Sequence, residues 1–139
     1  MKKAASSAFT LIELLVVISI IGILAAFIVP NVMGAQDKAK EAAVKAVAHT
    51  VQLAVEAYHL ENSVYPLSST ISLRSLIDNY LTAGGYMVTI PKNPFTGTEY
   101  SVDDHAGQIT YSYDDASNKY LITAFKRNGA TQILQLSNF

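Results

Sequence analysis

The sequence predicts an α+β protein in which a long N-terminal helix packs on a small antiparallel β-sheet head. Three observations support this prediction: an apolar run over residues 9–29, a helical hydrophobic period that continues to about residue 61, and alternating strand patterns near the C-terminus. The 139 residues allow one small domain with an appendage. We therefore expect a membrane or filament-core half-helix over 9–30, an amphipathic half-helix over 31–61 and a head over 62–139.

The apolar run predicts a membrane-spanning helix. Its 21 residues would extend about 31 Å, close to the thickness of the hydrocarbon core of a bilayer. A buried core helix is one alternative, but the rest of the chain is too small to cover such a helix on all sides. A cleaved secretory signal is another, but the run is longer than the apolar part of such signals and no A-x-A-type site closes it.

Charges beside the run predict its orientation. Lys2 and Lys3 precede it, whereas acidic and basic residues balance one another over 37–41. The positive-inside rule then keeps the N-terminus in the cytoplasm and places the head on the other side. We expect a single-pass protein of the inner membrane with its head in the periplasm or outside the cell.

Glu13 is the one charged residue in the apolar run. A carboxylate at that depth is costly, and such residues usually have a function. The alternative is that Glu13 lies near enough to the membrane surface to stay hydrated, with Lys2 and Lys3 helping to neutralise it.

The segment Ala8-Phe9-Thr10-Leu11-Ile12-Glu13-Leu14 resembles the processing signature of type IV pilins and the related pseudopilins. The resemblance implies that residues 1–8 form a leader, that a prepilin peptidase cuts between Ala8 and Phe9, and that the new amine of Phe9 is methylated. Ala8 departs from the family pattern, which has glycine before the cut. Cleavage also removes Lys2 and Lys3 and so changes the formal net charge from −1 to −3.

The new amine explains why Glu13 stands in an apolar run. The cationic amine of Phe9 and the carboxylate of Glu13 attract strongly in a low dielectric, whether they belong to one chain or to two. In a filament, an unpaired charge in the apolar core is heavily penalised, so the amine of one subunit and Glu13 of its neighbour fix the axial register. We therefore expect both residues to act in assembly.

Gly22 and Pro30 predict a weak stretch near the end of the apolar run. Glycine is a poor helix former, and proline cannot donate a backbone hydrogen bond. The family resemblance implies that residues 22–30 loosen when the chain assembles. We expect a nearly continuous helix in the isolated chain and an unwound stretch in a filament.

The resemblance also implies what the protein does. We expect the structural subunit of a type IV pilus-like filament, with identical subunits, a prepilin peptidase, an inner-membrane platform protein and an assembly ATPase as partners. The first alternative is the major pseudopilin of a type II secretion system, because Tyr65-Pro66 and residues 93–100 loosely resemble such heads. The second alternative is a membrane-anchored binding module that never polymerises.

Composition excludes several other classes. No cysteine is present, so neither a disulfide framework nor a cysteine-based metal site can form. The formal net charge of −1 argues against a protein that coats nucleic acid, and we expect no nucleic-acid partner. The chain carries no G-x-S-x-G, P-loop or dinucleotide fingerprint, and we expect that it is not an enzyme.

The amphipathic half-helix has two faces. Its polar stripe consists of Lys45, His49, Gln52 and Glu56. Its apolar stripe needs a partner, and the head is the plainest one. The residues of that stripe are Val44, Val47, Val51, Ala54, Val55 and Tyr58.

Local patterns predict the elements of the head. Residues 72–81 read as a short helix that Ser72 caps and Gly84-Gly85 ends, and an irregular loop follows. Three stretches then alternate as a three-stranded antiparallel meander, with an Asn128-Gly129 turn signal before the last. The strands are expected over 109–113, 120–125 and 131–136.

Four aspartates are candidate ligands of a calcium ion, which prefers hard oxygen ligands. They are Asp103, Asp104, Asp114 and Asp115. The resemblance to secretion pseudopilins implies calcium in this part of the chain, although residues 114–118 are also typical of a turn. We expect no other metal and no organic cofactor.

Overall fold

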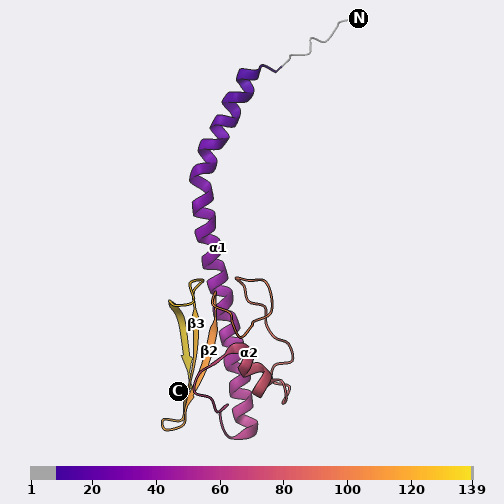
Figure 1. Ribbon diagram of the computed structural model, residues 1–139, viewed down its shortest axis with the longest axis vertical. Helices are drawn as coiled ribbons and strands as arrows, with labels where there is room; N and C mark the ends of the chain where they lie inside the picture. The colour runs from indigo at the N-terminus through magenta and orange to yellow at the C-terminus, as the bar shows by residue number, and fades with distance from the viewer. Residues whose placement is uncertain (1–8, 139) are drawn as a thin grey trace, which may run out of the picture. The chain divides into compact units, whose positions relative to one another are not determined.

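The computed structural model describes residues 9–138 and confirms the predicted α+β fold, with one long helix and a small antiparallel sheet (Figure 1). The chain forms two compact units whose boundary lies between Gln36 and Asp37. The elements in chain order are α1 (Leu11–Asn62), β1 (Ile71–Ser72), α2 (Leu73–Leu76), the π-helix η1 (Ile77–Leu81), β2 (Ile109–Asp114), β3 (Lys119–Phe125) and β4 (Gln132–Ser137).

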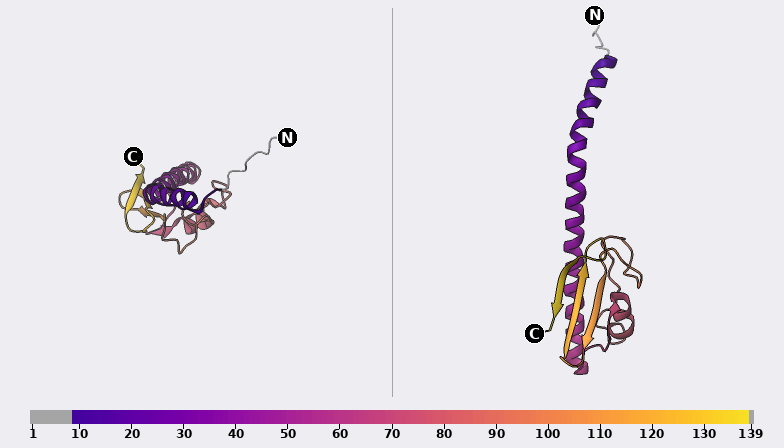
Figure 2. Two further views of the ribbon diagram at one scale, coloured as in Figure 1. Left: turned by 90° about the horizontal axis from the view of Figure 1, so that it is seen from above. Right: turned by 60° about the vertical axis from the view of Figure 1, so that its left-hand side comes forward.

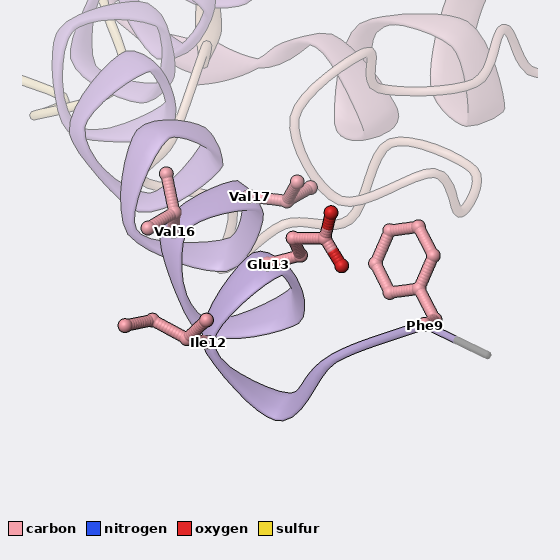
Figure 3. Close-up of a pocket in the computed structure, with 5 residues that line it drawn as sticks. All are labelled: Phe9, Ile12, Glu13, Val16 and Val17. Atoms are coloured by element: carbon pink, nitrogen blue, oxygen red, sulfur yellow. The ribbon is translucent and has the colours of Figure 1, made fainter. Parts of the chain in front are cut away.

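The first unit contains the N-terminal part of α1, the start of which is shown in Figure 3. The helix passes without a break through positions 22 and 30, as expected for an isolated chain. Its large apolar side chains are exposed: Leu11 is 80% exposed and Ile23 is 61% exposed. By length and composition, α1 is the one helix of the described chain that could cross a membrane.

The second unit begins with the amphipathic part of α1, and the predicted apolar stripe is confirmed. Val44, Val51 and Val55 are fully buried, and Val47 and Tyr58 pack against the core as partly buried residues. Two residues of the predicted polar stripe, Gln52 and Glu56, are partly buried and hydrogen-bonded to tyrosines of the head.

Four strands form the sheet, in the order β1-β2-β3-β4, and every neighbouring pair is antiparallel. The right-hand view of Figure 2 shows the orange to yellow strands β2, β3 and β4 side by side. The predicted meander corresponds to β2, β3 and β4, each within one residue of its expected bounds. The prediction of three strands is wrong because β1 was missed. This strand has only two residues, which pair with Tyr111 and Thr110, and two residues are too few to show an alternating pattern.

The predicted helix over 72–81 is divided in the structure. Ser72 ends β1 and also caps α2, where its hydroxyl accepts a hydrogen bond from the Ser75 amide at 3.3 Å. After one turn the helix widens into η1, because the Thr82 amide bonds to the carbonyl of Ile77 five residues earlier, at 2.9 Å. The capping role of Ser72 is thus confirmed, whereas the expected uniform α-helix is wrong.

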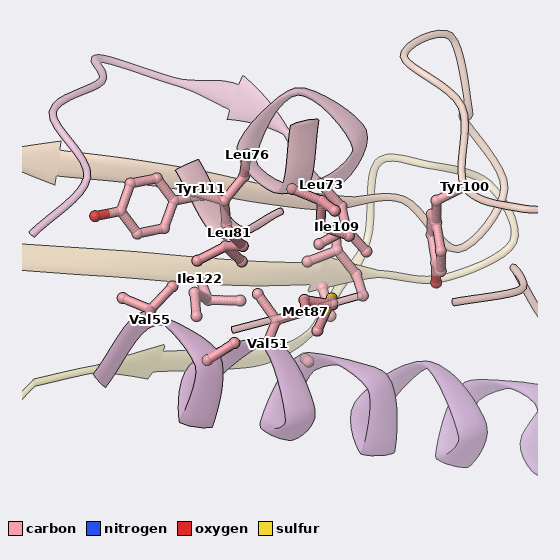
Figure 4. Close-up of a cluster of buried hydrophobic side chains, with 14 of the residues drawn as sticks. Val51, Val55, Leu73, Leu76, Leu81, Met87, Tyr100, Ile109, Tyr111 and Ile122 are labelled. Carbon is pink, nitrogen blue, oxygen red and sulfur yellow. The ribbon is translucent and has the colours of Figure 1, made fainter. Parts of the chain in front are cut away.

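The core of the head lies among α1, the sheet and the α2–η1 segment (Figure 4). Val51 and Val55 enter it from α1, and Ile122 enters it from β3. Three tyrosines are also almost fully buried, and each uses its hydroxyl. Tyr100 donates to the Gly107 carbonyl at 3.0 Å, Tyr111 to the Pro66 carbonyl at 2.9 Å and Tyr120 to Glu56 Oε1 at 2.6 Å.

The loop before β2 is organised by Asn93, a fully buried polar side chain whose role was not predicted from the sequence. Its Nδ2 donates to the Ala106 carbonyl at 2.8 Å and to Asp104 Oδ2 at 3.1 Å. Its Oδ1 accepts from the Phe95 amide at 2.9 Å. Asn93 therefore joins two stretches of the loop that are more than ten residues apart.

Charged residues of the β3–β4 connection contact α1 within the second unit. Arg127 Nη1 lies 3.3 Å from Asp37 Oδ1, and Lys126 Nζ lies 3.8 Å from Glu41 Oε1. The predicted turn at Asn128-Gly129 is present. Gly129 has a φ of +66°, and a Cβ there would lie 2.7 Å from the His105 carbonyl oxygen, so glycine is required.

Candidate assembly site

The candidate site lies at the N-terminal end of α1. Thr10 immediately precedes the helix, and Glu13 stands in its first turn. The Thr10 amide donates to Glu13 Oε2 at 2.9 Å and the Thr10 hydroxyl to the same oxygen at 2.7 Å, while the Glu13 amide donates to the Thr10 hydroxyl at 3.3 Å. This reciprocal arrangement is a capping box, and it fixes the Glu13 side chain at the helix terminus.

An open hollow of about 340 Å³ lies beside the carboxylate and is lined by Phe9, Ile12, Glu13, Val16 and Val17. Ile12 and Val16, like Glu13 and Val17, are four residues apart and so neighbours along α1, whereas Phe9 precedes the helix. Figure 3 shows the Glu13 carboxylate on the side of the helix where Phe9 lies. Glu13 is the only charged residue over 9–36, so the hollow offers one negative group in apolar surroundings.

The Glu13 carboxylate has one oxygen that Thr10 does not use. Both hydrogen bonds from Thr10 go to Oε2, which leaves Oε1 to a further donor. An amine that reached Oε1 would form a charge-assisted hydrogen bond, and apolar neighbours would strengthen the attraction. The site can therefore hold a positively charged group.

The structure brings Phe9 and Glu13 together, but Ala8 lies outside the described residues. Positions 22 and 30 lie within α1, away from this hollow. Thr10 is a partner of Glu13 that was not predicted from the sequence. The Thr-x-x-Glu pattern ahead of an apolar run was the signal that would have found it.

The candidate calcium ligands do not converge. Asp103 and Asp104 precede β2, whereas Asp114 ends this strand and Asp115 follows it. Asp104 Oδ2 already accepts hydrogen bonds from Asn93 Nδ2 and the Ser101 amide. Among the described residues, no three His, Asp or Glu side chains are grouped to hold a metal ion, so the donor set does not fit calcium.

Comparisons with known proteins agree with this geometry. A family model described as the prokaryotic N-terminal methylation motif matches residues 3–29, the region that holds the capping box and the hollow. The N-terminal segment therefore carries a prepilin-type motif, which stands at the start of the long apolar helix.

A second family model, described as type II secretion system protein G, matches residues 31–119. Curated relatives with the name type II secretion system core protein G are similar over most of their length. The protein of Vibrio cholerae is 40% identical, over 71% of this chain and 71% of the relative. That of Aeromonas hydrophila is 38% identical over 73% and 76%, and that of Klebsiella michiganensis 36% over 70% and 73%.

The chain thus belongs to the type II secretion system protein G family. The resemblance to prepilin-type proteins and secretion pseudopilins is confirmed. No solved structure matches the chain. The comparisons favour the secretion alternative over a surface pilus, and this family is one of structural subunits rather than of enzymes. The apolar helix and the prepilin-type motif together fit a protein anchored in the inner membrane.

Proposed function

We propose that this chain is the major pseudopilin of a type II secretion system, the repeating subunit of a short filament that serves protein export. One observation carries the proposal: in a chain of the protein G family, a single carboxylate stands in an otherwise apolar, exposed helix face. Such a face needs lipid or further copies of the chain to cover it. The relatives' names supply the secretion system.

The proposed chemistry begins with processing. A prepilin peptidase cuts between Ala8 and Phe9, and the amine of Phe9 is then methylated. The resulting cation pairs with Glu13 of a neighbouring subunit, for which Oε1 is the available oxygen. Because an unpaired charge in the apolar filament core is costly, only the axial position that joins amine and carboxylate is stable.

The same proposal includes the membrane and the partners. The N-terminus faces the cytoplasm and the head faces the periplasm, where the pseudopilus grows. Besides identical subunits, the partners are an inner-membrane platform protein and an assembly ATPase. Residues 22–30 are helical in the single chain and loosen in the filament, where backbone groups freed near Gly22 and Pro30 are covered by neighbouring subunits.

Replacement of Glu13 tests this function. In the cell that produces the protein, Glu13→Val should leave the chain cleaved and in the membrane, but should reduce filament yield and protein export at least about tenfold, because the loss of one buried ion pair exceeds 1.4 kcal/mol. Ser19→Val is the matched control, since it replaces another polar residue of the same apolar helix and leaves Glu13 in place. It should export normally.

Three outcomes separate the proposal from its alternatives. Loss of long surface fibres with unchanged export would identify a pilus subunit instead. Normal export by a chain without residues 9–36 would favour a binding module that never polymerises. Normal filament yield from Glu13→Val would reject the role of the carboxylate, whatever the filament is.

A further inference from the structure

The C-terminal end of the head is tied to the turn between β2 and β3 by one side chain. Asn138 follows β4, and its Nδ2 donates to the Asn118 carbonyl at 2.8 Å. Its Oδ1 accepts from the Tyr120 amide at 3.2 Å. One amide side chain thus satisfies an acceptor in the turn and a donor at the start of β3.

Asn118, the turn residue whose carbonyl accepts from Asn138, is also hydrogen-bonded to a residue of β2. Asn118 has a φ of +52°, a conformation that asparagine adopts more readily than most residues. Its Oδ1 accepts a hydrogen bond from the Tyr113 hydroxyl at 2.8 Å. Side chains from β2 and from the residue after β4 therefore meet at Asn118.

Asp114, which ends β2 at this turn, accepts hydrogen bonds from other residues of the turn. Asp114 Oδ1 accepts from the Ala116 amide at 3.2 Å, and Asp114 Oδ2 accepts from the Ser117 hydroxyl at 2.7 Å. A calcium ion takes about six to eight oxygen ligands. Both oxygens of Asp114 are engaged in hydrogen bonds within the turn, so this carboxylate has partners without an ion. The turn is thus closed by hydrogen bonds of its own residues.

The residues of this closure extend past the part of the chain that the family model matches. That match ends at residue 119, whereas Tyr120, β4 and Asn138 come later. Within the described chain, β4 adds a fourth strand to the sheet and carries Asn138 back to the β2–β3 turn.

We propose that Asn138 and Asn118 form a hydrogen-bonded lock that closes the β2–β3 turn, and that the head folds without calcium. The lock joins the last strand, the turn and β2 through Asn138, Asn118 and Tyr113. Calcium dependence, which the resemblance to secretion pseudopilins implies, is replaced in this chain by amide chemistry. This inference concerns folding of the head and stands independently of the proposed function.

Thermal unfolding with and without calcium tests the first half of the proposal. The full chain, purified in detergent, is heated in excess EGTA and in millimolar CaCl2, and near-ultraviolet circular dichroism of the tyrosines reports the packing of the head. The two midpoints should agree within about 1 °C. A rise of about 3 °C or more with CaCl2, but not with MgCl2, would overturn the claim that the head folds without calcium.

Replacement of Asn138 tests the second half. Asn138→Ala should lower the midpoint in EGTA by about 3–6 °C, because the Asn118 carbonyl and the Tyr120 amide lose their partner. Asn138→Asp should lower it less, since a carboxylate still accepts from the Tyr120 amide. Gln135→Ala is the control, because this exposed β4 side chain bonds only to Gln132, and its midpoint should stay within about 1 °C.

The variants also separate the lock from general damage to the C-terminus. If Asn138→Ala fails to fold, Asn138→Asp and Tyr113→Phe still report on the two ends of the lock, and each should lower the midpoint in EGTA. Unchanged midpoints in both Asn138 variants would overturn the lock.

Discussion

The two units of this molecule differ in the exposure of their apolar side chains. In the second unit, α1, the sheet and the α2–η1 segment enclose a core in which Leu76 and Val55 are fully buried. In the first unit, comparable side chains such as Leu15 and Ile18 are more than half exposed. One unit buries its apolar side chains against itself, whereas the other leaves them for lipid or for further copies of the chain.

This difference indicates which part of the chain determines the stability of the fold and which part determines assembly with other copies. The head's free energy of unfolding comes from contacts within one chain, so substitutions there change folding. The N-terminal part of α1 gains its burial only in a membrane or a filament, so substitutions there should change insertion or assembly. Full-length protein in detergent, unfolded with urea and followed by tyrosine circular dichroism, reports the head alone, since all eight tyrosines lie in the second unit.

Replacing a leucine by alanine in each unit tests the difference between them most directly. Leu76→Ala should lower the head's free energy of unfolding by about 3 kcal/mol, because a fully buried leucine leaves a cavity. Leu15→Ala, at a residue that is 53% exposed, should change it by less than about 0.5 kcal/mol. Equal effects in urea unfolding would show that the two parts of α1 fold as one cooperative unit.

A buried polar residue should give the next largest effect. Asn93→Ala should cost about 2 kcal/mol, because the Phe95 amide and the Ala106 carbonyl lose the fully buried side chain that is their partner. Asn62→Ala is the control, since this asparagine is exposed and its partners can bond to water. Similar urea midpoints for the two variants would mean that Asn93 does not organise the loop.

Alkaline pH should unfold the head before it affects the N-terminal part of α1. Burial raises the pKa of Tyr100, Tyr111 and Tyr120 above the usual value for tyrosine. A folded-state pKa above the unfolded value means that the contribution to stability is complete below about pH 10 and is lost as the pH rises toward the folded-state value.

The expected slope is up to about 1.4 kcal/mol per pH unit for each tyrosine that ionises only in the unfolded state. Urea unfolding at about pH 9 and about pH 11 measures this slope. Tyr120→Phe should unfold with a shallower pH dependence, although it also loses a hydrogen bond to Glu56. A free energy of unfolding that is the same at both pH values would contradict the burial of these hydroxyls.

The smallest effect should come from the ion pair between Arg127 and Asp37, near the start of the second unit. The Arg127 side chain is 64% exposed and that of Asp37 is 40% exposed, so Arg127→Ala should cost about 0.3 kcal/mol, and the difference should disappear in high salt. Urea unfolding at low and high ionic strength measures it. A cost above about 1 kcal/mol that persists in salt would show that the β3–β4 connection holds α1 more firmly than exposed charges can.

The sequence predicted those parts of the fold that repeat locally. The buried stripe of α1 follows a helical period, and β2, β3 and β4 alternate, so each element was found within a residue or two. The candidate site was predicted through Phe9 and Glu13, because a charge in a long apolar run is conspicuous. The role of Thr10 was not predicted, although the Thr-x-x-Glu capping pattern that it forms with Glu13 is local in the sequence.

Elements without a local pattern could not be predicted. Gln52 and Glu56 look like a solvated stripe until Tyr65 and Tyr120 are brought to them from elsewhere in the chain. β1 is a strand only because β2 lies beside it, and its two residues would otherwise read as the start of a helix. In each case the decisive partner is distant in the sequence.

By itself, the sequence determined the long helix, its apolar half, the lone carboxylate near its start and the alternating strands, because side-chain period and charge are properties of neighbouring residues. Only the tertiary structure decided how Asn93 organises its loop, how Asn138 closes the β2–β3 turn and why the aspartates do not gather around an ion. The physical reason is that a buried polar group is stable only beside its hydrogen-bond partner, and folding chooses that partner.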